Sequence, residues 1–318
     1  MKLVRKLADL QDCGPVVLAV GFFDGFHRGH QAVLAEARRM AEAAGALAGA
    51  VTFSPHPAAV LFPDRPVELL QTEEEKERML AALGMDVAVI IRPTAAFLAE
   101  SAEEFLRSLR EIRGLRGVVC GENFTFGAGA AGTPDAMKRY FAGTDVAVFT
   151  VPLAVSGAIG GRVVSSTEIR RLVREGDMRR AAALLGRRYS LSGGVARGFR
   201  RGTNDTGYPT ANLVFGADRV LPADGVYASF ARIRGRRFPA VTNVGRNPTF
   251  GNAQRTVETF ILHFDESIYG EPFAVEFVER LRGEIRFPSA AALAAQIAGD
   301  IARADRLLRE EAEKDAPA

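Results

Sequence analysis

One stretch near the start of the chain constrains the fold most: residues 16–30 read VVLAVGFFDGFHRGH. The apolar run Val16–Val20 is typical of a buried strand in a parallel sheet. Gly21 and Gly25 then permit a tight turn and close approach by a ligand. Because residues 28–44 place apolar side chains at helical spacing, the stretch predicts a strand, a turn and a helix in succession.

Two histidines, His27 and His30, fall at the start of this predicted helix. Their i, i+3 spacing puts both on one side of the first turn, where unpaired N–H groups and a partial positive charge suit phosphate. Two histidines alone also fit core packing or a metal pair, for which Asp24 or His56 offers a third ligand. No cysteine or HExxH pattern supports the metal, so the junction as a whole favours phosphate binding.

Length and composition describe an ordinary globular protein. The 318 residues predict about two domains, and 47% hydrophobic with 25% charged residues is a typical balance. The net charge of +3 is weak support for nucleic acid and equally fits polyphosphate ligands. Two cysteines, Cys13 and Cys120, are too few for a disulfide framework or a zinc site. Without a long apolar run or a signal-peptide pattern, we expect a cytoplasmic protein that does not enter a membrane.

The first half of the chain alternates strand and helix patterns. Further strands are expected at 48–53, 86–91, 117–120 and 146–151, with helices starting after Thr72, Ser101 and Thr133. This order predicts a Rossmann-like α/β domain, an open parallel sheet with helices on both faces. Such sheets bind ligands at the carboxyl ends of their strands, which is where His27 and His30 fall.

The segment SSTEIR, residues 165–170, opens another helix. Ser165 and Glu168 form a capping-box pattern, and a second helix is expected from about 177 to 185. A well-capped helix is sufficient to explain the pattern. Hydroxyls followed by Arg170 also make an anion site, since an arginine fork holds phosphate with two hydrogen bonds.

Beyond residue 187 the pattern changes to alternation with a period of two, as in 226–233, 257–264 and 273–281. We place a domain boundary at 186–188, giving domains 1–187 and 188–318. The second domain is predicted to be a mainly β antiparallel barrel or sandwich. A final helix from Ser289 to about 313 is expected to pack on it, with a dimer contact as the alternative.

Two features of the second domain do not indicate a function when taken alone. Residues 193–212 read GGVARGFRRGTNDTGYPTAN, a Gly/Arg loop that fits either a mobile surface segment or a phosphate cradle, but not a Walker loop. Glu258 alternates with apolar residues on a predicted strand and by pattern alone is an ordinary solvent-facing acid.

Three motifs in order, HxGH, SSTxIR and PTAN, resemble those of the bacterial bifunctional riboflavin kinase/FAD synthetases, members of the HxGH nucleotidyltransferase superfamily. The resemblance covers nearly the whole chain. It implies that the C-terminal domain converts riboflavin and ATP to FMN and ADP. It also implies that the N-terminal domain converts FMN and a second ATP to FAD and pyrophosphate.

The resemblance also implies roles for individual residues. His27 and His30 would stabilise the transferring phosphate, Arg170 the leaving pyrophosphate, and Glu258 would be the general base of the kinase. Thr210 and Asn212 would ligate Mg²⁺ beside ATP. The remaining assignments are nucleotide contacts at Gly21, Phe23, Asp24, Gly29, Ser165, Ser166, Thr167, Gly202 and Gly207, and flavin contacts at Phe62, Asn123 and Phe126.

Two departures from the family pattern lie in one loop. Asn123 replaces the aspartate of the usual G-x-D-F, and the basic residue common a few positions later is replaced by Ala and Gly within 128–132. Both fall where the flavin is expected.

Two other classes of function share features with this sequence. An aminoacyl-tRNA synthetase shares HxGH but needs a KMSKS-like loop, which the sequence lacks. A nucleic-acid-binding protein would use the arginines at 232, 234, 236 and 237, although such a face is usually just solvated. We therefore expect small-molecule partners and no nucleic acid, while the sequence leaves the oligomeric state open.

Overall fold

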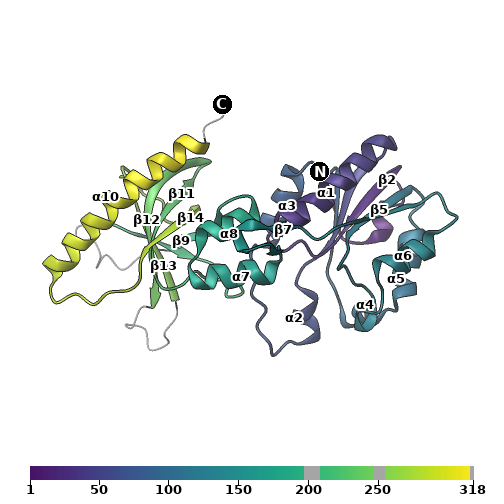
Figure 1. Cartoon of the computed structure of the whole chain (residues 1–318), viewed down its shortest axis with the longest axis horizontal. Helices are drawn as coiled ribbons and strands as arrows, with labels where there is room; N and C mark the ends of the chain where they lie inside the picture. Colours follow the sequence, from purple (N-terminus) through teal and green to yellow (C-terminus); the bar gives the residue numbers. More distant parts are fainter. Residues whose placement is uncertain (197–207, 247–254, 316–318) are drawn as a thin grey trace. The chain divides into compact units, whose positions relative to one another are not determined.

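A computed structural model describes residues 1–196, 208–246 and 255–315 (Figure 1). The chain forms two compact units, Met1–Ser166 and Thr167–Ala318.

The first unit is built on a six-stranded sheet in the order β1-β4-β3-β2-β5-β6, and every pairing is parallel. Its strands are β1 (Lys2–Val4), β2 (Val16–Val20), β3 (Leu47–Phe53), β4 (Val87–Ile91), β5 (Leu115–Gly121) and β6 (Ala147–Val151). Five of these six lie where the sequence predicts them. The edge strand β1 was not predicted, because three residues carry too short a pattern.

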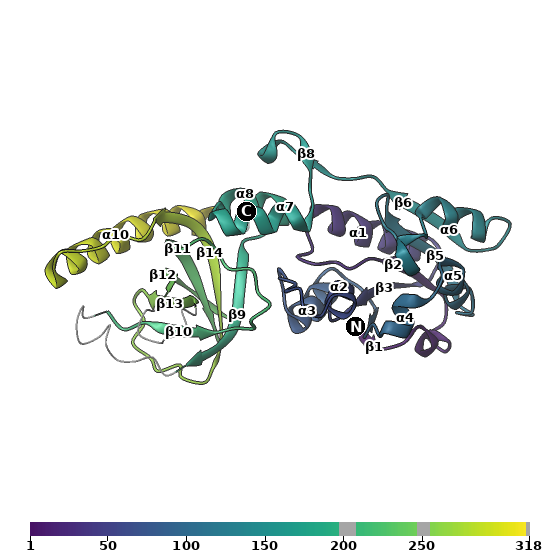
Figure 2. The same cartoon turned by 90° about the horizontal axis from the view of Figure 1, so that it is seen from below.

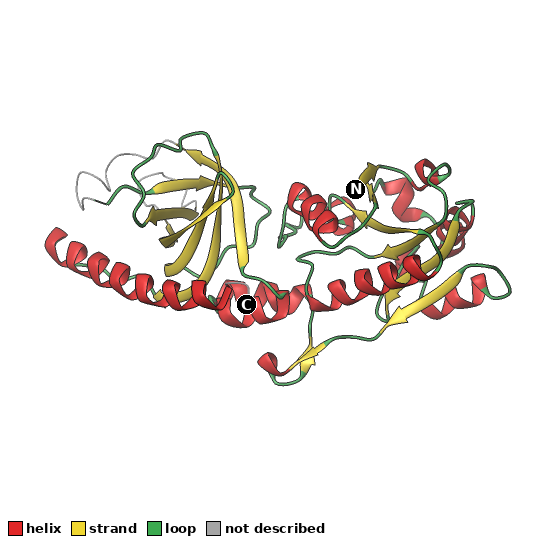
Figure 3. Cartoon of the chain, turned by 90° about the horizontal axis from the view of Figure 1, so that it is seen from above, coloured by secondary structure: helices red, strands yellow, loops and turns green. Residues whose placement is uncertain are grey.

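Helices cover both faces of this sheet, as predicted (Figure 3). α1 (Arg28–Ala43) and α3 (Glu73–Ala82) pack on one face through residues such as Leu34 and Leu80. α5 (Ala102–Arg110) and α6 (Pro134–Phe141) pack on the other. The smaller elements are η1 (Leu7–Leu10), α2 (Pro57–Leu61), α4 (Ala95–Ala99), η2 (Ala128–Ala130), β7 (Val155–Ser156), η3 (Gly157–Ile159) and β8 (Arg162–Val163).

The predicted helix starts are confirmed by their hydrogen bonds. Thr72 Oγ1 accepts from the Glu75 N–H at 3.1 Å, and the Glu75 carboxylate accepts from the Thr72 N–H at 2.8 Å. Ser101 and Glu104 form the same reciprocal box, and Thr133 caps α6. Local capping chemistry therefore fixes where α3, α5 and α6 begin.

The second unit contains a closed antiparallel barrel in the order β10-β13-β12-β11-β14-β9 (Figure 2). The strands are β9 (Tyr189–Ala196), β10 (Ala211–Val214), β11 (Gly225–Ile233), β12 (Arg236–Arg246), β13 (Arg255–Ile261) and β14 (Pro272–Arg282). Before the barrel come α7 (Ser166–Glu175) and α8 (Met178–Leu185), the latter packed on β9 and β14. The predicted antiparallel β domain is confirmed, and of the two architectures expected it is the barrel.

The final helix α10 (Ala290–Asp315) lies along the outside of β11 and β12, as the first of the two alternatives predicted. Ala304 and Leu308 are buried against Phe230 and Val241 of the barrel. Within this helix, Asp300 accepts from Arg282 Nε at 2.8 Å, and both side chains are largely buried.

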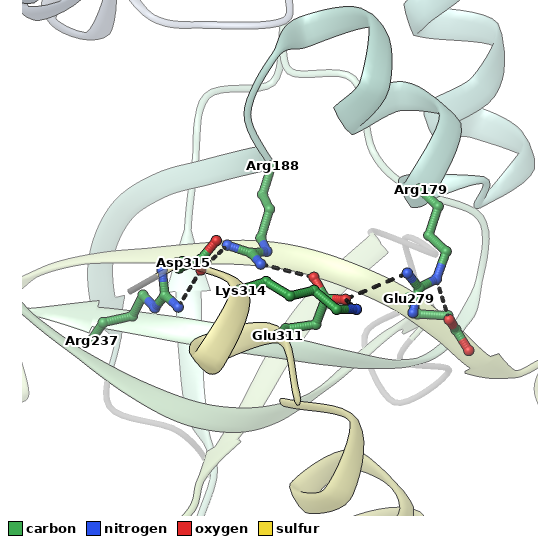
Figure 4. Close-up of polar contacts among 7 residues, drawn as sticks. All are labelled: Arg179, Arg188, Arg237, Glu279, Glu311, Lys314 and Asp315. Carbon is green, nitrogen blue, oxygen red and sulfur yellow. Dashed lines mark hydrogen bonds and ion pairs between the residues drawn. The ribbon is translucent and has the colours of Figure 1, made fainter. Parts of the chain in front are cut away.

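The end of α10 is held by a network of ion pairs (Figure 4). Arg188 reaches Asp315 at 2.6 Å and Glu311 at 2.9 Å, while Arg237 reaches Asp315 at 2.6 Å. Arg179 of α8 lies 3.5 Å from Glu311. Burial tends to raise the pKa values of Glu311 and Asp315, but their basic partners outweigh it and hold both values below the usual range.

Candidate functional site

The turn after β2 has an unusual backbone. Gly25 has φ +80°, which glycine adopts without penalty. Phe23 and Phe26 also lie in the left-handed region, at φ +52° and +40°, although neither is glycine. Bulky residues there are uncommon and persist only where the surroundings hold them. The sequence predicts a turn here, and the structure adds that its conformation is strained.

Side chains from elsewhere in the first unit hold this turn by its backbone carbonyls. The bonds run from Thr52 Oγ1 and Lys76 Nζ to Phe22 O, from Gln71 Nε2 to Phe23 O, from Ser166 Oγ to Asp24 O and from Gln31 Nε2 to Phe26 O. Each is 2.7–2.9 Å long. Apart from Gln31, these residues are distant from the turn in sequence, and they include Ser166, the first helical residue of the SSTxIR motif.

Asp24, predicted to contact nucleotide, is buried in the turn. Its two carboxylate oxygens accept from the Leu70 N–H at 3.0 and 3.2 Å. Phe23 is buried as well, stacked on Phe26 and set edge-on to His30 at 5.4 Å between ring centroids. These two predicted residues therefore shape the turn from within.

His27 and His30 lie together at the start of α1. His27 is the N-cap, and its Nδ1 accepts from the His30 N–H at 3.3 Å. The two rings stack with centroids 3.6 Å apart. Because Nδ1 of His27 accepts, the proton of the neutral ring sits on Nε2, where it can be donated to an anion.

His30 is held in its uncharged form. Burial, followed by the charges of His27 and Lys76, keeps its pKa well below the usual range. Its Nδ1 is buried and has no hydrogen-bond partner among the described residues. A buried nitrogen without a partner beside a helix N-terminus is a position where a ligand can supply the missing bond.

Gly21 and Gly29 leave room for these aromatic rings. A Cβ on Gly21 would lie 2.8 Å from the Phe23 ring, and one on Gly29 would lie 3.2 Å from the His27 ring. Larger residues at either position would displace the ring beside it. Both predicted glycines therefore contribute by contact with the turn and its histidines.

The SSTxIR segment lies where the first unit ends. Ser165 and Ser166 are half-buried, and Ser166 is the residue bonded to Asp24 O. Thr167 is exposed and Arg170 half-buried, both on α7 in the second unit.

A cavity of about 600 Å³ opens beside the loop that follows β5. Asn123 lines it, together with Phe124, Lys138 and Thr150. The Thr150 Oγ1 is buried without a partner among the described residues, and so is available to a ligand. This volume is in the range of small-molecule sites. The two other predicted flavin residues lie elsewhere: Phe126 is buried in the core against Phe105, and Phe62 is exposed after α2.

In the second unit, three polar residues form a row across neighbouring strands. Asn212 of β10 lies directly opposite Glu258 of β13, and Glu258 lies opposite Asn243 of β12. Residues directly opposite one another in antiparallel strands project to the same face, with Cβ atoms about 5 Å apart. The predicted metal ligand and the predicted base are therefore neighbours, although 46 positions separate Asn212 and Glu258 in sequence.

This row lies on the outer face of the barrel. Thr259 and Thr242, the next residues along, point inward and join Ser229 in a buried chain of hydroxyl contacts at 3.0 and 2.7 Å. Phe260, on the outer face, packs with the cluster under α10 and meets the Tyr208 ring at 5.2 Å. Burial raises the pKa of Glu258, which favours proton acceptance nearer neutral pH.

Some predicted residues lie outside the described part of the chain. These are Gly202 and Gly207, with most of the Gly/Arg loop. Thr210 is described and half-buried, two residues before Asn212.

The arginines considered for nucleic-acid binding have partners within the barrel unit. Arg234 is paired with Glu271 at 2.5 Å, Arg237 with Asp315 at 2.6 Å, and Arg232 with Glu276 at 3.3 Å. Arg236 stacks on Phe238 at 4.8 Å. With three of the four charges paired to acids, this face offers little net charge to a phosphate backbone.

Sequence reasoning missed the residues that support the sites from a distance. Lys76, Thr52 and Gln71 hold the turn, and Asn243 stands beside Glu258. Each belongs to a segment that reads as an ordinary helix start or strand.

Comparison with known proteins places both halves of the chain. Residues 10–168 match the FAD synthetase family, and residues 185–308 match the riboflavin kinase family. In a fold comparison, the crystal structure described as a macrolide-efflux protein from Streptococcus pneumoniae superimposes with a TM-score of 0.85 at 30% identity. That match covers 94% of this chain and 96% of the other, and it concerns the fold. No helix in the described ranges is long and apolar enough to span a bilayer.

The names of the curated relatives state both activities. The bifunctional riboflavin kinase/FMN adenylyltransferase of Listeria monocytogenes is 34% identical, over 89% of this chain and 90% of that protein. The Escherichia coli K12 protein of the same name is 32% identical, over 94% and 96% of the two chains. The chain therefore belongs to the bifunctional riboflavin kinase/FMN adenylyltransferase family, with its FAD synthetase segment N-terminal and its riboflavin kinase segment C-terminal.

Proposed function

We propose that the two reactions of this family take place at the two sites described above. The first unit adenylylates FMN at the turn after β2, and the barrel phosphorylates riboflavin along the row that contains Glu258. The observation that carries the first assignment is the histidine pair at the start of α1, held by a turn that Ser166 ties to the SSTxIR motif.

In the adenylyl transfer, an oxygen of the FMN phosphate attacks the α-phosphorus of ATP. One P–O bond forms, the bond to the β-phosphate oxygen breaks, and pyrophosphate leaves. His27 donates from Nε2 to the transferring phosphate, and the ring of His30 and the N–H groups of α1 contribute further donors. Arg170 holds the pyrophosphate. Catalysis here is positioning and charge stabilisation, without a covalent intermediate.

For the flavin, we propose the cavity beside Asn123. The amide of Asn123 both donates and accepts, which suits the polar edge of an isoalloxazine ring. The Thr150 Oγ1, which has no partner among the described residues, supports a second polar contact in the same cavity. Phe124 supplies an apolar wall.

In the kinase reaction, the terminal ribityl hydroxyl attacks the γ-phosphorus of ATP. Glu258 accepts the hydroxyl proton, the new P–O bond forms, and ADP leaves. Glu258 is half-buried, which keeps it partly away from water and matches a base whose pKa is raised by burial.

The residues around Glu258 fit Mg²⁺. The ion prefers hard oxygen ligands and is commonly held by few protein groups together with substrate phosphates. Asn212 offers an amide oxygen and Thr210 a hydroxyl, next to the carboxylate of Glu258 that accepts the proton. No three side chains among His, Cys, Asp and Glu converge into a metal cage in the ranges described, so this donor set suits a site completed by ATP. When bound, Mg²⁺ neutralises charge on the phosphates.

Three further expectations belong to this proposal. The functional boundary lies at 186–188, between a transferase domain 1–187 and a kinase domain 188–318. The enzyme works in the cytoplasm. Its partners are riboflavin, FMN and ATP, without nucleic acid or membrane.

The test is to incubate the chain with riboflavin and ATP, with Mg²⁺ or with EDTA, and to separate the flavins by chromatography. FMN should appear first and FAD second, and EDTA should stop both. FMN without FAD would contradict the first assignment, and no FMN would contradict the second.

A further inference from the structure

Lys76 is unusual because its side chain is buried, although it lies on a helix with another face exposed to solvent. It lies in the first turn of α3 and is only 4% exposed. Lysine is almost never buried unless its charge is matched. Its neighbour Arg78, two positions along the same helix, is exposed in the ordinary way.

The ammonium of Lys76 is directed at two strand ends. Nζ donates to Phe22 O at 2.9 Å, to Phe53 O at 2.8 Å and to Thr52 Oγ1 at 3.3 Å. It also lies 4.2 Å from the centroid of the Phe22 ring. All three donors of the group are therefore used where β2 and β3 end, directly behind the turn that carries the histidines.

The charge at this position is costly to the fold. Burial lowers the pKa of Lys76 to about 8, against the opposing influence of Asp24 and Glu73. The other titratable neighbours are His30 and His27 of α1, and the charge of Lys76 helps keep the pKa of His30 low. An uncharged residue would avoid this penalty, so stability alone does not explain a lysine here.

We propose that Lys76 is a positioning residue of the adenylyl-transfer site, fixing the turn at Phe22 and placing a positive charge behind His30. The inference rests on the function proposed above. Together with burial and the charge of His27, which contribute more, the charge of Lys76 lowers the pKa of His30, and it favours the approach of an anionic polyphosphate. The hydrogen bonds keep the strained turn in place.

The experiment compares the full chain with Lys76→Gln, Lys76→Met and Lys76→Arg. Gln keeps hydrogen-bond donors and loses the charge, Met loses both, and Arg keeps the charge. Arg78→Met is the control, because it removes an exposed cation from the same helix. Riboflavin phosphorylation by the same chain reports whether the variants remain folded and active at the other site.

Two readouts are needed. The first is kcat/KM for ATP in FAD formation. It should fall at least tenfold in the Lys76→Gln and Lys76→Met variants and remain nearer the wild-type value in Lys76→Arg. In the control Arg78→Met it should be unchanged. The second is the pKa of His30, followed through its imidazole NMR signals, which are assigned with His30→Ala among only four histidines. That pKa should rise in Gln and Met and stay near the wild-type value in Arg.

The outcomes separate this inference from the proposed function. If the wild-type chain makes no FAD, the proposed function is wrong. If it makes FAD and both neutral variants match it in kcat/KM and in the His30 pKa, the role of Lys76 is overturned. A loss of activity with an unmoved His30 pKa would leave only a structural anchor and would also overturn the proposal. If the Lys76→Gln variant does not fold, the Lys76→Met variant, which has a side chain of similar length, decides the result.

Discussion

Replacing Glu258 by glutamine should separate catalysis from stability in the kinase unit. The amide keeps the shape of the side chain and loses the base. General-base catalysis contributes ~10²–10⁴-fold, which corresponds to about 2.7–5.5 kcal/mol of transition-state stabilisation. We therefore expect kcat for FMN formation to fall at least about a hundredfold, while flavin binding changes much less because the amide still bonds the hydroxyl.

The same substitution should leave the thermal stability of the protein unchanged or raise it, although it lowers the activity. Burial raises the pKa of Glu258 in the folded state above its value in the unfolded chain. At pH values between these two pKa values, the native state therefore binds more protons than the unfolded state. Stability conferred by this residue therefore falls as pH rises through that window. At neutral pH the ionised side chain is unfavourable, and the Gln variant lacks this penalty. Its Tm should equal or exceed that of the wild type at pH 7–8, with the difference closing below about pH 4.

The assay follows FMN formation by chromatography and unfolding by a thermal melt, each across pH. Glu276→Gln is the matched control: it removes a carboxylate from β14 that pairs with Arg232 and lies outside the polar row. FAD formation from supplied FMN shows that the rest of the chain is intact. A Gln variant that keeps a tenth or more of the activity, or one that melts well below the wild type, would refute the reasoning.

Other substitutions test the remaining assignments. His30→Ala should abolish FAD formation while FMN formation continues; normal FAD synthesis by the folded variant would rule the residue out. Asn123→Ala should raise the KM for FMN in the second step more than the KM for ATP, and equal changes would show that this loop does not contact flavin. Arg188→Ala should lower the stability of the barrel unit by about 1–3 kcal/mol in a thermal melt, since it removes charge-assisted bonds at 2.6 and 2.9 Å. The fragment 188–318 should make FMN and never FAD. The longer fragment 167–318 retains the helix packed on β9 and β14, and it should show the same activity with a higher Tm. If both fragments were folded but inactive, the first unit would be needed to complete the kinase site.

The parts of the fold that could be predicted are those with local causes. Thr72 and Ser101 fix helix starts through bonds within four residues, and the run Val16–Val20 is apolar enough to require burial. Strand β9 was missed because Gly193 and Gly194 interrupt its alternation, and β12 because Pro239 and polar residues break its pattern.

The candidate sites divide in the same way. The histidine pair is local and could be read directly, because i, i+3 spacing on a helix determines proximity. The row of Asn212, Glu258 and Asn243 depends on the register of three strands, which the sequence does not specify. Lys76 gave no signal, because its burial depends on how α3 packs against the ends of β2 and β3.

The ion pairs at the end of α10 have a topological consequence. Arg188 precedes the first barrel strand, and Asp315 is the last residue described, so a bond of 2.6 Å joins the entrance and the exit of this segment of the chain. Between them, 126 residues form a loop that is closed without a covalent link. Such an arrangement suits circular permutation: joining 315 to 188 by a short linker and opening the chain elsewhere should preserve the barrel. It also makes this segment a portable module, which can be placed behind another domain without rearranging its own ends.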